Sequence, residues 1–177
     1  VIGSGLIGRL LSWRLTQAGH QVDILSSDDK QGTDSAGHVA AAMIAPATEA
    51  VSAEAKVNEI GLQSLQLWPQ WLAELPEQVF YRDQGTLVVA HAGDHAEMAR
   101  YQRRADHVLS KNSYQTLDRQ QLAGHEQDLA DNFESAMLFE NEACLDNRQL
   151  YKSLTKILDK ACNWQQCDEI DQITESV

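Results

Sequence analysis

The sequence predicts an α/β protein with a β-α-β unit at its start and a later segment of helices and antiparallel strands. Three observations support this class. Residues 1–8, VIGSGLIG, form a glycine-rich turn between a strand and a helix. Apolar residues recur at helical spacing in 54–75 and 148–161. Between these two stretches, short β-branched runs alternate with turn signals, as expected for strands without regular β-α-β order.

The first 25 residues contain the β-α-β unit. Val1 and Ile2 are predicted to end one strand, and residues 21–25 are predicted to form the next. The helix between them has three apolar residues on one side, Leu11, Leu15 and Ala18. Because the glycines fall at the turn from strand to helix, the context favours a nucleotide-binding turn.

Each glycine of the pattern Gly3-x-Gly5-x-x-Gly8 has a physical role. Gly3 permits a tight turn, Gly5 lets the backbone approach a pyrophosphate, and Gly8 lets the helix pack closely on the strand. The phosphates would lie at the helix N-terminus, where free N–H groups favour negative charge. Leu6 and Ile7 complete the predicted cofactor-binding turn. We therefore predict a Rossmann-like dinucleotide site rather than an ordinary glycine-rich turn.

The strand after this helix ends on an unexpected residue. An acidic side chain that holds the ribose is expected about 20 residues after the glycines, but the position falls on Ser26, followed by Ser27. Both serines are predicted to bind the ribose, although a hydroxyl bonds more weakly than a carboxylate. Asp28 could substitute if the loop bends back. No Lys or Arg stands at the strand end, so NADP is disfavoured.

The charge of the chain argues against direct nucleic-acid binding. Fourteen Lys and Arg stand against 26 Asp and Glu, for a net charge of −12. Such a surface repels phosphate backbones. The basic run at 100–104 lies on a predicted helix beside Glu97 and Asp106, and it is interpreted as a solvated helix face.

Cysteine and histidine usage favours a cytoplasmic protein without a metal site. Cys144, Cys162 and Cys167 are odd in number and lack metal-type spacing, so they are predicted to be core thiols in a reducing compartment. His91 and His95 straddle a predicted helix start, which spoils their geometry as a ligand pair. No apolar run approaches the roughly 18 residues of a membrane span, so no membrane partner is expected.

The middle of the chain is predicted to change from helix to sheet. The long helix at 54–75 contains Pro69, which should kink or break it. Trp68 and Trp71 in this helix are interpreted as packing residues rather than as a ligand platform. The remaining predicted elements are strands at 79–82, 85–90 and 135–139, helices at 94–109 and from 118, a helix capped by Asn147, and two short strands within 164–173. We expect an inserted antiparallel sheet.

The segment from His38 to Pro46 is unusually rich in small residues. Small side chains let a backbone approach something flat or bulky, but alanines also favour a short buried helix. From the residues alone, both interpretations stay open.

Five segments occur in the order and spacing of a known family: GSGLIG, AAAMIAPATE, SLQLWPQWLAEL, YRDQGTLVVA and ACLDNRQLYKSL. They resemble the glycine oxidases, FAD-dependent enzymes of the D-amino-acid oxidase superfamily that are associated in bacteria with thiamine biosynthesis. The resemblance covers only the N-terminal half of a family member, so the chain is expected to be incomplete. It implies a FAD-binding domain in 1–79 and 142–177, with part of an α+β substrate-binding domain in 80–141.

The resemblance also implies contacts with FAD. One segment is expected to pass beside the flavin ring with its backbone, at His38, Ala40, Ala41, Ala42 and Met43. Ile170 is expected to give backbone contacts on the adenine side. The family usually has Glu at the position of Ser26 and Gly at the position of Ala42. We expect a variant that still binds FAD, either more weakly or with the help of other contacts.

The implied reaction is oxidation of the amine of glycine or another small amino acid. A hydride passes to the flavin, water hydrolyses the resulting imine to an oxo acid, and O2 is reduced to H2O2. The catalytic residues are unknown here, since the resemblance implies that they come from the C-terminal half. Family members are commonly homo-oligomers. Two alternatives stay open: the FAD domain of a tRNA wobble-uridine modification enzyme, which the acidic charge disfavours, and a degenerate non-catalytic dinucleotide-binding homologue.

Overall fold

The computed structural model describes residues 1–167, which form two compact units. The first unit contains residues 1–42 and 70–80 together with the described residues from Leu145 onward. The second contains residues 43–69 and 81–144. Helices and strands occur in both units, so the predicted α/β class is confirmed. The domain ranges given above stay a prediction.

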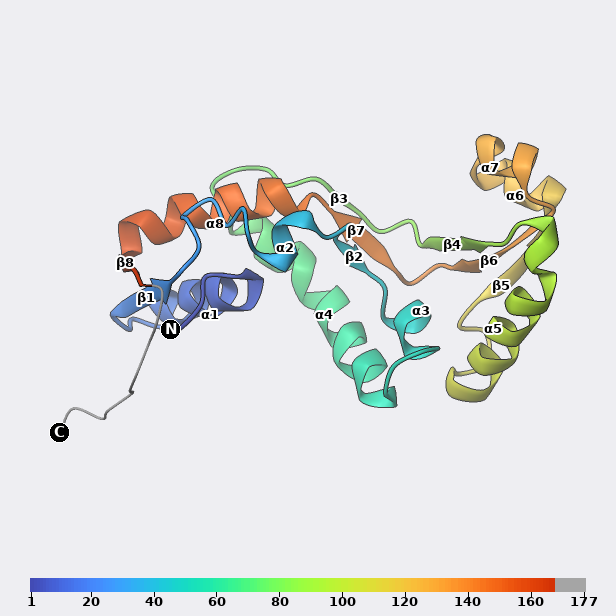
Figure 1. Ribbon diagram of the computed structural model, residues 1–177, viewed down its shortest axis with the longest axis horizontal. Coiled ribbons are helices and arrows are strands. Elements are labelled where there is room, and N and C mark those ends of the chain that lie inside the picture. Colours follow the sequence, from blue (N-terminus) through green and yellow to red (C-terminus); the bar gives the residue numbers. More distant parts are fainter. Residues whose placement is uncertain (168–177) are drawn as a thin grey trace. The chain divides into compact units, whose positions relative to one another are not determined.

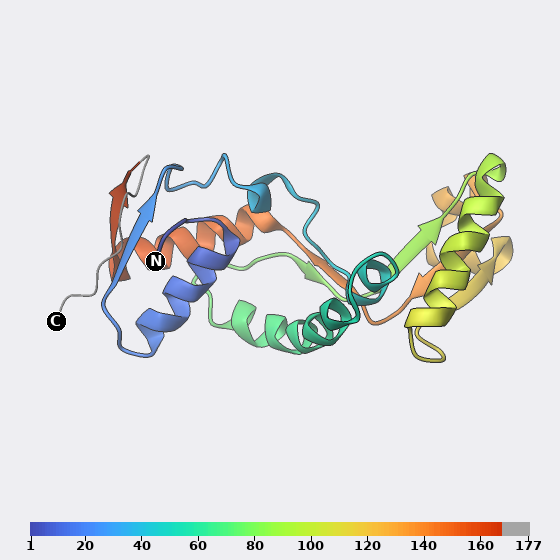
Figure 2. The same cartoon turned by 60° about the horizontal axis from the view of Figure 1, so that its bottom comes forward.

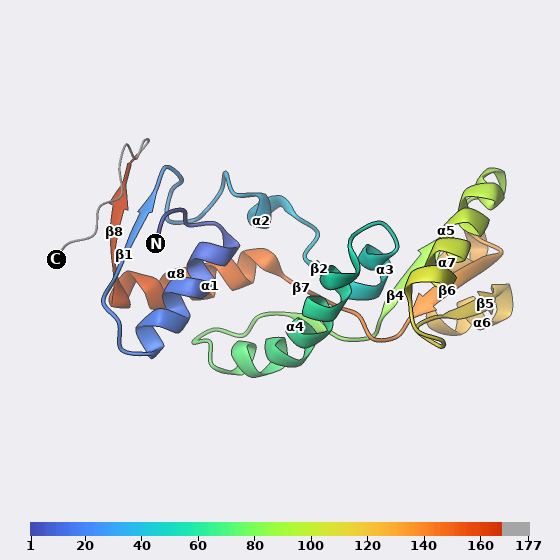
Figure 3. The same ribbon diagram turned by 90° about the horizontal axis from the view of Figure 1, so that it is seen from below.

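The first unit is a short parallel sheet with helices packed beside it. In Figure 3 the two strands β1 and β8 lie side by side, and they pair in parallel from Val22–Cys162 to Ser26–Gln166. Ile2 adds a parallel bridge to Leu25, which confirms the predicted β-α-β unit. In Figure 1, α2 lies beside α8. The elements of this unit are α1 (Leu6–Gln17), β1 (Val22–Ser26), α2 (Ala36–Val39), α8 (Asn147–Ala161) and β8 (Cys162–Gln166).

The buried face of α1 differs from the predicted one. Leu11 is 49% exposed, whereas the buried residues of this helix are Arg9, Ser12 and Trp13. Trp13 packs edge to face against Trp71, with ring centroids 6.1 Å apart. The apolar pattern was misleading because a buried arginine and a buried serine do not contribute to it.

α8 supplies much of the core of the first unit. Leu150, Leu154 and Leu158 are at most 1% exposed and recur every four residues, which puts them on one face. The helix is capped by Asp146, whose side chain accepts a hydrogen bond of 2.9 Å from the backbone N–H of Gln149. The predicted cap, Asn147, was wrong by one residue. The Asn147 side chain is therefore left to bond elsewhere.

The second unit contains two three-stranded sheets, in the orders β2-β7-β3 and β4-β6-β5. The pairings β2–β7, β4–β6 and β5–β6 are antiparallel, in agreement with the predicted antiparallel character of this part of the chain. Although β3 and β4 follow one another along the chain, they lie in different sheets. The strands are β2 (Met43–Ile44), β3 (Tyr81–Arg82), β4 (Thr86–Val89), β5 (Gln115–Asp118), β6 (Ser135–Phe139) and β7 (Ala143–Leu145). The sequence prediction missed β2, β5 and β7.

β6 is central to the second unit because both of its faces are buried. Ala136 and Leu138 belong to a core cluster with residues of α6 and α7, whereas Met137 and Phe139 belong to a cluster with α5. Figure 2 shows α5 running along this sheet. The helical elements of this unit are α3 (Pro46–Ala50), most of α4 (Ala55–Ala73), the 3₁₀ turn η1 (Ala92–Asp94), α5 (His95–Val108), α6 (Arg119–His125) and α7 (Gln127–Asn132).

Two predictions about helix surfaces in the second unit are confirmed. Asp118 accepts a 2.8 Å hydrogen bond from the N–H of Gln121, and the Gln121 side chain accepts one of 3.0 Å from the N–H of Asp118. This capping box starts α6 where the sequence placed a helix. On α5, Arg100 pairs with Glu97 at 3.2 Å while both side chains stay exposed, which fits a solvated face.

α4 confirms the long amphipathic helix predicted from the apolar spacing. Pro69 lies inside it, so the predicted break does not occur. Trp68 is only 8% exposed, in agreement with its interpretation as a packing residue. Neither α4 nor any other helix within residues 1–167 combines the length and apolar character needed to cross a membrane.

Candidate functional site

The turn at residues 3–8 has the geometry that a bound pyrophosphate needs. Gly3 has φ +90°, in the region that favours glycine. A Cβ added to Gly5 would meet no described atom within 4 Å, so this backbone faces open space. A Cβ on Gly8 would lie 2.0 Å from the carbonyl O of Gly3, which only glycine avoids. Leu6 and the 82% exposed Ile7 start α1. Since Gly5 has no side chain to cap them, the first N–H groups of α1 are suited to bind an anion.

Ser26, at the end of β1, joins the glycine turn to the loop after the strand. Its Oγ lies 2.7 Å from Ser4 Oγ, and both residues are buried. It also accepts a 3.2 Å hydrogen bond from the N–H of Asp28, so the loop does bend back over the strand end. A hydroxyl can make three hydrogen bonds, which leaves Ser26 one for a ligand. Ser27 is exposed, and Asp28 Oδ2 is buried without a hydrogen-bond partner among the described residues.

Arg9 is fully buried and connects the glycine turn to two other segments. Its guanidinium donates to three oxygens: Ser4 O at 2.6 Å, Thr155 Oγ1 at 2.6 Å and Lys30 O at 3.0 Å. It also lies over the rings of Tyr151 and Trp164, 4.7 and 5.3 Å from their centroids. Burial lowers the pKa of Arg9 from its ordinary value, and the ring faces and carbonyls offset part of the cost of burying the cation. Sequence reasoning missed this residue.

The segment rich in small residues is mostly extended, with one short helix. α2 ends at Val39, Ala40 is extended, and Ala40 and Ala41 are exposed. Ala42 has φ +55°, in the left-handed region that favours glycine. The short buried helix, one of the two open interpretations, is therefore not what the structure contains. The small side chains leave the backbone accessible.

Three polar residues of α8 hold this segment and the loop before it. Asn147, Tyr151 and Thr155 are spaced four residues apart and so share one face of the helix. Asn147 Nδ2 donates to the carbonyls of Gly37, His38 (3.1 Å) and Ala40 (2.8 Å). Ser35 Oγ forms a hydrogen bond of 2.9 Å with Tyr151 Oη. Thr155 Oγ1 donates to Lys30 O at 3.0 Å. The sequence signal for these contacts is the four-residue spacing of Asn147, Tyr151 and Thr155, which the sequence prediction did not use.

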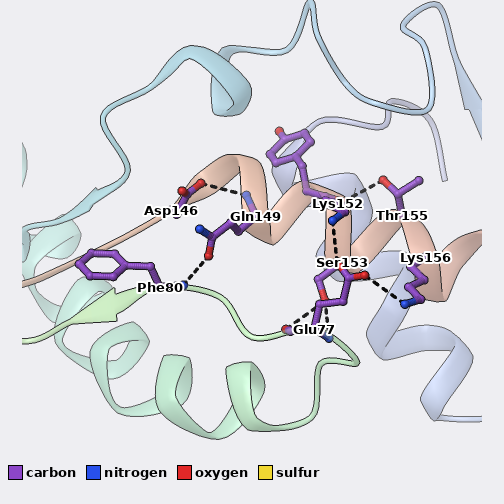
Figure 4. A network of polar contacts seen from close by, with 9 residues as sticks. Glu77, Phe80, Asp146, Gln149, Lys152, Ser153, Thr155 and Lys156 are labelled. Atoms are coloured by element: carbon purple, nitrogen blue, oxygen red, sulfur yellow. Dashed lines mark hydrogen bonds and ion pairs between the residues drawn. The ribbon is translucent and has the colours of Figure 1, made fainter.

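Another side of α8 is attached to residues 77–80, as Figure 4 shows. Glu77 accepts from Lys156 Nζ at 3.0 Å and pairs with Lys152 at 3.4 Å. The hydrogen bond from Lys156 is the main cause that lowers the pKa of Glu77. The N–H of Phe80 donates to Gln149 Oε1 at 2.8 Å. With contacts on both sides, α8 is a firm support for the loop that Asn147 contacts.

Most of the predicted cofactor-binding residues come together in the first unit. The glycine turn contacts the strand end through Ser4 and Ser26, and a Cβ added to Gly37 would lie 3.2 Å from Leu6 Cβ. The start of the small-residue segment is therefore adjacent to the start of α1. Met43 begins β2 in the second unit, and Ile170 lies outside the described residues.

An open glycine turn, an uncapped helix and a parallel strand pair define a dinucleotide-binding domain, and the pyrophosphate part of FAD fits this turn. The family described as FAD dependent oxidoreductase (DAO) matches residues 1–162. The chain belongs to this family. Members of this family depend on FAD, so the prediction of FAD as the cofactor is confirmed.

Similar proteins support the same assignment. A Rhizobium etli protein assigned to thiamine biosynthesis under the name oxidoreductase ThiO is 35% identical over 161 residues, which are 91% of this chain and 46% of the relative. The glycine oxidase of Bacillus cereus has a TM-score of 0.78 at 19% identity, covering 99% of this chain and 48% of that one. The enzyme of Geobacillus kaustophilus has a TM-score of 0.74 at 20% identity, covering 94% and 45%. The chain thus spans about half the length of these proteins and has their fold, and the resemblance to glycine oxidases is confirmed.

Proposed function

We propose that this chain forms the FAD-binding part of an oxidase that acts on glycine or another small amino acid. The observation that carries the proposal is the family match along residues 1–162, which coincides with a glycine turn whose backbone is open to a ligand. The fold likeness to two glycine oxidases favours a small amino acid as the substrate.

In this proposal each segment of the site has one task. The turn at 3–8 and the N-terminus of α1 hold the pyrophosphate, and Ser26 and Ser27 hold the ribose. The backbone at His38, Ala40, Ala41, Ala42 and Met43 would hold the flavin ring. FAD, when bound, supplies the hydride acceptor. This chain's own residues bind the cofactor and orient it.

The proposed reaction is an oxidative deamination with O2 as the electron acceptor. The amino acid loses a hydride and a proton to become an imine, and water hydrolyses the imine to an oxo acid and ammonia. Two electrons and two protons reduce O2 to H2O2.

We also propose that the protein is located in the cytoplasm, since Cys144, Cys162 and Cys167 are free thiols.

The test is a visible absorbance spectrum of the purified full-length protein, taken without oxygen before and after glycine is added. We expect flavin bands that bleach with glycine, followed by H2O2 when air is admitted. Flavin bands that respond only to another small amine would move the substrate away from glycine. A protein that binds no FAD, even when FAD is added, would contradict the proposal.

A pair of glycine variants provides the control. An added Cβ would meet no described atom within 4 Å at either Gly5 or Gly93. Neither Gly5→Ala nor Gly93→Ala should therefore disturb packing, but a methyl group at Gly5 would stand where the pyrophosphate approaches. We expect Gly5→Ala to weaken FAD binding about tenfold or more, equivalent to about 1.4 kcal/mol. Gly93→Ala should bind FAD like the unmodified protein.

A further inference from the structure

The segment that we assign to the flavin ring has little structure of its own. α2 has only four residues, far fewer than the 12 to 15 or so that a helix needs to be stable by itself in water. Val39 is 72% exposed, so burial of this side chain does not anchor the helix. Local backbone bonds connect the N–H of His38 to Ser35 O and that of Ala40 to Ala36 O, both at 3.0 Å. Something outside the segment has to fix it.

Asn147 meets this need with one side-chain amide. Its Nδ2 carries two protons and lies within hydrogen-bond distance of three carbonyls of the segment, those of Gly37, His38 and Ala40. These are the carbonyls that the end of a short helix leaves without a partner. Asn147 therefore closes the C-terminal end of α2 from 107 to 110 residues away.

The backbone that carries Asn147 is itself held in place. Asp146 caps α8 through Gln149, and the N–H of Asp146 donates to Phe80 O at 3.0 Å. One helical turn later, the hydroxyl of Tyr151 forms a hydrogen bond with the hydroxyl of Ser35. The donor group is thus presented from a fixed helix end to a weakly structured segment.

The hydrogen bonds to these carbonyls also determine the direction of the N–H group in each of the same peptides. In a trans peptide the C=O of one residue and the N–H of the next lie on opposite sides. Holding the Ala40 carbonyl toward α8 turns the N–H of Ala41 away from it. Among residues 1–167, no acceptor for this N–H is found. Ala41 therefore offers a backbone donor to a ligand on the side away from α8.

We propose that Asn147 is a positioning residue, which fixes the 37–41 backbone before FAD binds and so directs the Ala41 N–H toward the flavin. This inference rests on the proposed flavin contact of residues 38–43. Asn147 touches the backbone of the segment and acts on the cofactor only through it.

The experiment compares Asn147→Ala with a matched variant, Asn132→Ala. Asn132 Nδ2 also donates to a backbone carbonyl, that of Asp128 at 2.9 Å, but it lies in the second unit. Backbone amide exchange is measured on flavin-free protein, and the FAD dissociation constant and visible circular dichroism on the loaded protein. For Asn147→Ala we expect exchange at His38 and Ala40 to be about tenfold faster, FAD binding to be about tenfold weaker, and the flavin dichroism to change. Asn132→Ala should change none of these.

A second measurement needs no variant. If Asn147 holds the three carbonyls, its own side-chain amide protons should exchange with solvent more slowly in the unmodified protein than those of an exposed asparagine.

Asn147→Asp adds a sharper test, because it keeps the shape of the side chain but places an acceptor oxygen toward three carbonyls. We expect it to loosen the segment more than Asn147→Ala does.

The outcomes separate this inference from the proposed function. Unchanged exchange at His38 and Ala40 in Asn147→Ala, or fast exchange of the Asn147 side chain, would overturn the contact. Faster exchange with unchanged FAD affinity and dichroism would overturn the positioning role. An unmodified protein that binds no FAD would overturn the proposed function, and the flavin role of Asn147 with it, while exchange would still decide whether the contact forms.

Discussion

The glycine turn and the small-residue segment belong to the same proposed cofactor site but are held in different ways. The turn depends on three glycines within six residues, and its geometry follows from backbone and close packing at Gly3 and Gly8. The start of the small-residue segment and the residues before it, 35–40, are held by side chains of α8 that lie more than 100 residues later in the sequence. The first is local and the second is tertiary, so substitutions should affect them by different mechanisms.

The largest effect is expected from Gly8→Ala, which breaks the local region. Its Cβ would lie 2.0 Å from the carbonyl O of Gly3, so α1 would have to move away from the strand. We expect a loss of about 3 kcal/mol in the free energy of unfolding, measured by urea titration, together with loss of FAD binding. Gly124→Ala is the control, because a Cβ there meets no described atom within 4 Å. Equal stability of the two variants would show that the turn tolerates a wider separation.

The second effect concerns Arg9, which connects the glycine turn to Lys30 and to α8. Replacing Arg9 by Met removes the hydrogen bonds that its guanidinium donates to Ser4 O, Thr155 Oγ1 and Lys30 O. The buried Ser4 O is left without a donor among residues 1–167, whereas Lys30 O keeps the Thr155 hydroxyl 3.0 Å away. A buried acceptor left unsatisfied costs about 1 to 3 kcal/mol, so Arg9→Met should destabilise the protein by about that amount. Arg14, in the same helix, pairs with Glu74 at 2.8 Å but is 40% exposed. Arg14→Met should cost less than about 1 kcal/mol. If urea titration gives similar losses for both, the buried hydrogen bonds of Arg9 do not stabilise the fold more than an exposed ion pair does.

The same contrast explains what the sequence could predict. The glycine spacing and the β-branched residues beside it predicted the turn, the strand β1 and a dinucleotide site, because those features are encoded in neighbouring residues. FAD itself was implied only by the resemblance to the glycine oxidases. The burial of Arg9 and the contacts of Asn147 depend on partners that come together only after folding, and no local pattern contains them. Strands of two or three residues, such as β2 and β7, form because they pair with each other, so their own composition could not reveal them.

The smallest effect is expected at Ala42, where the tertiary region carries local strain. A non-glycine residue at φ +55° costs about 1 to 2 kcal/mol, and glycine removes this cost but adds roughly 0.4 to 1 kcal/mol of unfolded-chain entropy. Ala42→Gly should therefore raise the free energy of unfolding by at most about 1.6 kcal/mol. Ala40→Gly is the matched control: Ala40 has φ −64°, so glycine brings only the entropy cost and should lower stability. Urea titration of both variants measures the difference. Opposite signs would locate the strain at Ala42, whereas equal losses would mean that contacts such as those of Asn147 hold the segment without a strained residue.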